Sequence, residues 1–256
     1  MMPFVGARLA VMTWILLLFG ISEFGSAQAA GGGAGIFALR TMLEDKSPEI
    51  RIKAAEGLAR VGGRQAVIIL RRGLSDKLRE VRIAVVEALG FIGGRLAMTV
   101  LSEALKDKAP EVRIRTVEAL KDAGTVSAIP IIQKAFGDRE EQVRLHAALM
   151  LRKIGHRNGV PVLGQVILKD NSAAVRAAAA TYVGSIGAKD RRALGILAKA
   201  LEDKEPAVRI RVVESLGFLQ LPEAAAVLQQ ALADRDSGVR IRATEVMGRV
   251  LSKDFE

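Results

Sequence analysis

The chain has 256 residues, half of them apolar, and a formal net charge of +10. It contains no cysteine, which excludes disulfide bridges, thiolate metal sites and a cysteine nucleophile. Aromatic residues make up only 4% of the chain, so small aliphatic side chains supply most of the apolar fraction. Such side chains suit helices that pack about 8–10 Å apart. The positive charge favours acidic partners.

An apolar segment near the N-terminus predicts export. Residues 9–21 carry no charge and follow Arg8. This run is too short to span a bilayer comfortably, which takes about 20 residues, and it fits the core of a signal peptide. The sequence Ala-Gln-Ala before Ala30 predicts cleavage at that point, and an uncleaved N-terminal membrane anchor is the alternative. We therefore expect residues 1–29 to be a signal peptide and the mature protein, without a stable membrane span, to be periplasmic or secreted.

A glycine-rich segment at residues 30–35 predicts a flexible connection to the rest of the chain. Residues 36–256 then contain an internal repeat, in which an aspartate recurs every 31 to 33 residues. Each aspartate is followed five residues later by Ile or Val and six residues later by Arg. The pairs are Asp45 and Arg51, Asp76 and Arg82, Asp107 and Arg113, Asp138 and Arg144, Asp170 and Arg176, Asp203 and Arg209, and Asp234 and Arg240.

Each unit is predicted to contain two helices. Residues 65–74 and 192–201 are examples of the first helix, and residues 80–92 are an example of the second. Proline at the start of a second helix loses no hydrogen bond, and glycine after its last turn is a common stop. The prolines are Pro48, Pro110 and Pro206, and the glycines are Gly62, Gly93, Gly124, Gly155 and Gly187. No strand pattern interrupts this series, so the fold class is all-α.

The repeat unit resembles the short bacterial HEAT-like repeat of the phycobilisome-lyase type, over residues 34–251. The resemblance implies a right-handed α-solenoid of seven two-helix repeats, whose second helices line the concave face. It also implies that the aspartates and arginines form a structural ladder between neighbouring repeats. Aspartate in a turn can also accept backbone N–H groups, which is a stabilising role rather than a binding role.

A charged stripe follows one side of the second helices. Counting from the Ile or Val before each arginine, position three carries Lys53, Ala84, Arg115, His146, Ala178, Arg211 and Arg242. Position six carries Glu56, Glu87, Glu118, Leu149, Thr181, Glu214 and Glu245.

The stripe is interrupted in the fourth and fifth repeats by a group that we call the central patch, which comprises His146, Leu149, Thr181 and the neighbouring Tyr182. Tyrosine is enriched in binding hot spots, so the central patch, together with Arg211 and Arg242, is the candidate partner-binding surface. The alternative is that Leu149 and Tyr182 fill a gap in the core.

No residue pattern in the chain predicts catalysis, a cofactor or a metal site. The two histidines, His146 and His156, are not followed by glutamate, whereas the HEAT-repeat deoxyhypusine hydroxylases bind iron through His-Glu pairs. Removal of residues 1–29 leaves no tryptophan and one tyrosine, which argues against binding of extruded bases. We expect an exported scaffold that binds an acidic protein partner through its concave helix face. The alternative is an enzyme or enzyme subunit, either lyase-type or a metal-dependent oxidoreductase.

Overall fold

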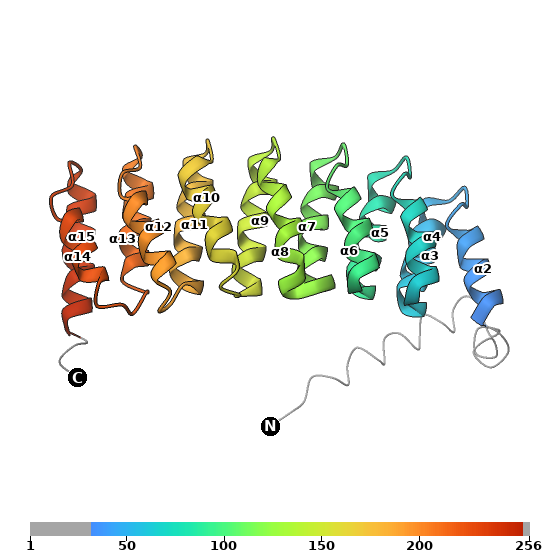
Figure 1. Ribbon diagram of the computed structural model, residues 1–256. Helices are drawn as coiled ribbons and strands as arrows, with labels where there is room; N and C mark the ends of the chain where they lie inside the picture. Colours follow the sequence, from blue (N-terminus) through green and yellow to red (C-terminus); the bar gives the residue numbers. More distant parts are fainter. Residues whose placement is uncertain (1–31, 253–256) are drawn as a thin grey trace, which may run out of the picture.

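The computed structural model describes residues 32–252, and within this range the chain forms helices and no strand. Figure 1 shows the helices side by side in a single row, with α2 at one end and α15 at the other. Each repeat contributes one helical segment to each of two layers. The structure therefore confirms the predicted all-α solenoid, and the two ends of the row lie far apart.

The helices of the first layer are mostly shorter than those of the second layer. The first layer contains α2 (Gly32–Met42), α4 (Gly63–Gly73), α6 (Gly94–Ala104), the segment η1 (Thr125–Ala128), α8 (Ile129–Ile132) and η2 (Gln133–Gly137), α10 (Gly159–Lys169), α12 (Arg191–Ala200) and α14 (Ala224–Ala231). The second layer contains α3 (Pro48–Val61), α5 (Arg79–Ile92), α7 (Pro110–Gly124), α9 (Glu141–Ile154), α11 (Ala173–Ile186), α13 (Pro206–Leu216) and α15 (Ser237–Ser252).

The predicted helices agree with these bounds to within two residues. The prolines predicted at helix starts occupy the first turn of α3, α7 and α13. Gly62 and Gly93 end their helices with φ of 68° and 67°, a conformation that residues with a Cβ rarely adopt.

Two of the predicted glycine stops have another role. Gly124 is the last residue of α7, and the chain turns at Thr125, whose φ is 45°. A Cβ at Gly124 would lie 2.0 Å from Sδ of Met98. Gly187 has a φ of −95°, and a Cβ there would lie 2.5 Å from the carbonyl oxygen of Val183. Close packing against the backbone therefore excludes a Cβ at Gly187, whereas at Gly124 the Met98 side chain would have to move; neither glycine adopts a left-handed turn.

The glycine-rich segment differs from its predicted conformation. Residues 30–35 were expected to be flexible, but α2 begins at Gly32. Glycine is a poor helix former, and packing supplies the missing stability, because Leu39 and the nearby Leu43 are buried in the core. The predicted signal peptide, residues 1–29, lies outside the described residues. Between residues 32 and 252, no helix has both the length and the apolarity needed to cross a bilayer.

The second layer forms the more closely packed side of the solenoid. Each second helix contacts the next one extensively, whereas neighbouring first helices contact each other less. One apolar side chain recurs in this layer, seven residues after the arginine, and is almost fully buried in each repeat from the first to the sixth. These side chains are Leu58, Leu89, Leu120, Leu151, Val183 and Leu216. We call the exposed side of the second layer, which carries positions three, six and ten of each repeat, the second-helix face.

Candidate functional site

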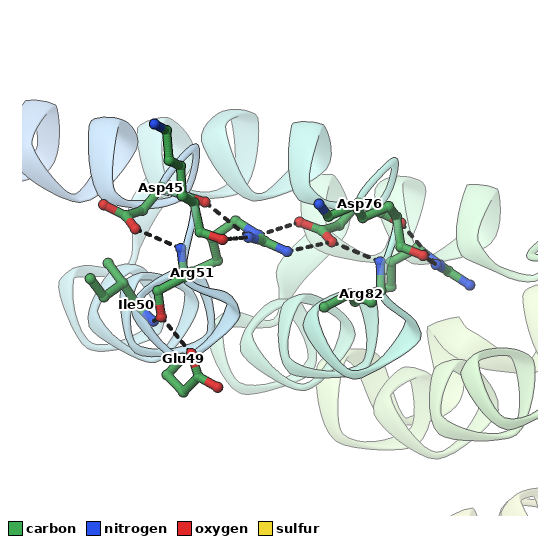
Figure 2. A network of polar contacts seen from close by, with 10 residues as sticks. Asp45, Glu49, Ile50, Arg51, Asp76 and Arg82 are labelled. Carbon is green, nitrogen blue, oxygen red and sulfur yellow. Dashed lines mark hydrogen bonds and ion pairs between the residues drawn. The ribbon is translucent and has the colours of Figure 1, made fainter.

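The arginine of each repeat links its own turn to the turn of the next repeat. Arg51 donates from Nε and Nη2 to the two carboxylate oxygens of Asp76, at 2.6 and 3.0 Å. Its Nη1 donates to the carbonyl oxygens of Asp45 and Lys46 in its own turn. The carboxylate of Asp76 also accepts the N–H of Leu78 at 2.9 Å. Figure 2 shows this arrangement, in which one guanidinium satisfies four oxygen atoms.

The same bidentate pair recurs along the described part of the chain, with Nε–Oδ2 distances of 2.6 to 2.8 Å. The arginines of these pairs are only 2–6% exposed. The pairs are Arg51 with Asp76, Arg82 with Asp107, Arg113 with Asp138, Arg144 with Asp170, Arg176 with Asp203 and Arg209 with Asp234. We call this series the ladder.

The pKa values of Asp76 and Arg82, two members of the ladder, are shifted toward the charged forms. Burial raises the pKa of the Asp76 carboxyl, but the hydrogen bonds from Arg51 and the Leu78 N–H outweigh it and hold the pKa below its ordinary value. The hydrogen bond to Asp107 likewise raises the pKa of Arg82. A buried ion pair whose remaining donors and acceptors are also satisfied compensates for the desolvation of its charges. The ladder is thus a structural element, because its side chains form ion pairs with one another.

The charges of the second-helix face are largely paired with one another. Arg115 contacts Glu118 on its own helix and Glu87 on the preceding second helix. Glu214 contacts both Arg211 and Arg242 in the same way. Further pairs within one helix join Lys53 with Glu56 and Arg242 with Glu245. Both candidate arginines, Arg211 and Arg242, therefore lie in an exposed ion-pair network.

The central patch lies on the adjacent helices α9 and α11. Leu149 and Tyr182 are half-buried, and both pack against the core. Nε2 of His146 lies 3.7 Å from a carboxylate oxygen of Glu118, and its Nδ1–H donates to the Gln142 carbonyl. The exposed Thr181 donates its hydroxyl proton to the Ala177 carbonyl at 3.1 Å. Tyr182 and Leu149 thus each contact the core and remain partly exposed to solvent.

Two basic residues adjoin the central patch. The guanidinium of Arg152 lies 5.6 Å from the centre of the Tyr182 ring, which is within range of a cation–π interaction. Lys153 is exposed and stands one helical turn after Leu149, so the two residues share a face of α9. Among the described residues, neither of these cations has an ion-pair partner, in contrast to the arginines of the flanking stripe.

The family assignment rests on nearly the whole repeat region. The family model described as HEAT repeats matches residues 37–121, 98–167 and 160–248. The chain belongs to the HEAT-repeat family. A search of curated proteins finds no significant match.

Several solved structures are similar to this chain at low identity. Human deoxyhypusine hydroxylase in complex with glycerol is 20% identical, with a TM-score of 0.40, and 85% of this chain and 96% of that chain are covered. An engineered protein is 21% identical, with a TM-score of 0.46, and 85% and 68% are covered. The complex of CpcE and CpcF of phycocyanin lyase from Nostoc sp. PCC7120 is 22% identical, with a TM-score of 0.47, and 59% and 97% are covered. These similarities concern the fold alone.

Neither histidine of this HEAT-repeat protein lies in a group of side chains that could bind a metal ion. His146 contacts a single carboxylate, and Nδ1 of His156 accepts the N–H of Asn158 at 3.2 Å. Over residues 32–252, no group of three or more His, Asp or Glu side chains is placed to hold a metal ion.

Two exposed aromatic residues of the HEAT-repeat array were missed by the sequence analysis. Phe91 and Phe218 are 76% and 58% exposed. Both occupy position ten of their repeats; Phe91 lies in α5 of the second repeat, and Phe218 lies in the turn directly after α13 in the sixth. A phenylalanine at a position that holds Arg60 or Lys153 in other repeats is the signal that could have identified them.

Proposed function

We propose that this HEAT-repeat protein is an exported scaffold that binds an acidic protein partner along its second-helix face. The observation that carries the proposal is the contrast between the central patch and the stripe around it. Arg115, Arg211 and Arg242 are neutralised by glutamates, whereas Arg152 and Lys153 have no carboxylate partner among residues 32–252. Unpaired cations beside a half-exposed ring match a partner with carboxylates around an apolar anchor.

The exposed aromatic residues extend this surface beyond the central patch. Phe91 and Phe218 stand two repeats before and one repeat after the patch along the same face. Neighbouring helices in such arrays lie about 8–10 Å apart, so the three apolar points would contact an elongated partner at separated places. A long partner segment, held by an aromatic contact near each end and by charge at the middle, is the binding mode that this arrangement supports.

The charge part of the proposal is tested with Lys153→Glu. We expect the association rate with the partner to fall about tenfold at low salt, because exposed interface charges act mainly on encounter, and the difference should shrink as salt screens the charges. The matched control is Lys199→Glu on α12, which makes the same charge change at an exposed first-layer position. Association kinetics would be measured by surface plasmon resonance. Equal slowing by both variants would contradict a local role for Lys153.

The export part of the proposal is tested on the N-terminus of the mature protein. We expect N-terminal sequencing of protein from the producing cells to begin at Ala30, because Ala-Gln-Ala precedes this position. Fractionation should then place the protein in the periplasm or the medium. A mature chain that still begins near Met1 and sediments with membranes would contradict cleavage and support the membrane anchor.

A further inference from the structure

The ladder is incomplete at its α2 end. The Asp45 carboxylate accepts the N–H of Ser47 at 2.8 Å, as the other ladder aspartates do with their own turns. No guanidinium contacts it among the described residues, and it stands at the open end of the row in Figure 2. Ladder arginines precede their aspartates by 25 to 27 residues. Residues 18–20, at that distance before Asp45, are Leu, Phe and Gly, so the chain has no arginine at this register.

The ladder is also incomplete at its α15 end, in the opposite sense. Nη1 of Arg240 donates to the carbonyl oxygens of Asp234 and Arg235, at 2.8 and 3.2 Å, as in every other repeat. This contact holds the guanidinium in the ladder orientation. Its Nε and Nη2 have no carboxylate partner in the described part of the chain, and the residue is exposed. One end of the solenoid thus presents the acceptor half of a ladder pair, and the other end presents the donor half.

Apolar side chains at the two ends are complementary in the same way. Ile50, before the first ladder arginine, is 36% exposed, whereas the residues at the same position in all later repeats are 0% exposed; these are Val81, Val112, Val143, Val175, Val208 and Val239. Ile241, after the last arginine, is 60% exposed. Its counterparts in the second to sixth repeats are half-buried and pack against the core; they are Ile83, Ile114, Leu145, Ala177 and Ile210. Each end is therefore one half of an internal repeat interface.

We propose that copies of this chain stack head to tail, with Arg240 of one copy paired to Asp45 of the next. The interface would reproduce the internal one, with the bidentate ion pair at the turn edge and Ile241 of one copy against the α3 end of the other. A second copy is the occupant that the geometry favours, since the two open halves belong to the same repeat pattern and carry opposite charge. Such a heterologous contact does not close on itself by a two-fold axis and extends into an open row.

Charge reversal at either end tests the stacking. The purified protein is expected to form larger species as its concentration rises, measured by sedimentation velocity. Asp45→Arg and Arg240→Asp should each weaken this self-association about tenfold or more, because each places like charges at the junction. The double variant restores an ion pair of reversed polarity and should associate again. Circular dichroism serves as the folding control, since neither residue belongs to an internal ladder pair.

Mixing the two single variants gives the sharper result. Each variant alone has like charges at every junction, but in the mixture each junction can join opposite charges. We therefore expect the mixture to regain the association that both components lack. A protein that remains monomeric at all concentrations would overturn the proposal. Association that is as strong in both single variants as in the wild type would also overturn it, because the contact would then lie elsewhere, for example on residues 1–31.

Discussion

Arg144→Ala is expected to lower the free energy of unfolding by about 3 kcal/mol, since breaking a buried ion pair leaves an uncompensated charge. Arg144 is 6% exposed and donates to both carboxylate oxygens of Asp170, to the side chain of Asn171 and to the carbonyl of Asp138. Truncation would leave the buried carboxylate of Asp170 without its cation. The stability of a solenoid depends on each interface between neighbouring repeats. A weaker interface between the fourth and fifth repeats should therefore lower the stability of the whole array.

The matched control for this prediction is Arg115→Ala. Arg115 also contacts carboxylates, those of Glu87 and Glu118, but its side chain is 47% exposed. Exposed ion pairs contribute about 0–1 kcal/mol, so this variant should unfold close to the wild type. Urea denaturation followed by circular dichroism measures both. Equal stability of Arg144→Ala and the wild type would show that the ladder does not hold neighbouring repeats together.

Tyr182→Ala is expected to weaken binding of the protein partner about 30-fold, mostly through faster dissociation. A buried aromatic anchor contributes about 2 kcal/mol to binding, and about 1.4 kcal/mol corresponds to a factor of ten. The half-buried ring also packs against the core and supports Arg152. Some loss of stability should accompany the substitution, so dissociation would be measured by surface plasmon resonance well below the melting range.

Two further variants separate an anchor from a packing residue. Tyr182→Phe keeps the ring and its contact with Arg152, and it should bind nearly as the wild type does. Thr181→Ala removes a neighbouring side chain whose hydroxyl is already bound to the Ala177 carbonyl, and it should have a small effect. If Tyr182→Ala melts many degrees lower while its folded fraction binds normally, Tyr182 is a core residue and the central patch is not the binding surface.

The repeat register, the helix starts and the fold class follow from local sequence signals. Apolar periodicity, proline in the first turn and glycine after a last turn act within one or two helical turns, so Pro48 and Gly62 mark their positions without knowledge of the rest of the chain. These local signals did not predict the conformation where packing between repeats determines it. At Gly187 the carbonyl oxygen of Val183 leaves no room for a Cβ. The helix at Gly32 exists because Leu39 is buried.

The resemblance to the HEAT-like repeat implied a ladder between neighbouring repeats, but only the tertiary structure decided which atoms of the functional residues meet. The spacing of six residues along the chain places each arginine within reach of the aspartate of its own turn. In the stacked repeats, Nε and Nη2 of the arginine instead donate to the aspartate of the next repeat. Only Nη1 donates to carbonyl oxygens of its own turn. The contact of Arg152 with Tyr182, the pairing of Arg242 with Glu214 and the exposure of Phe91 likewise depend on how one helix lies against the next. A one-dimensional pattern states which residues recur, whereas the rotation and spacing between repeats determine which of them meet.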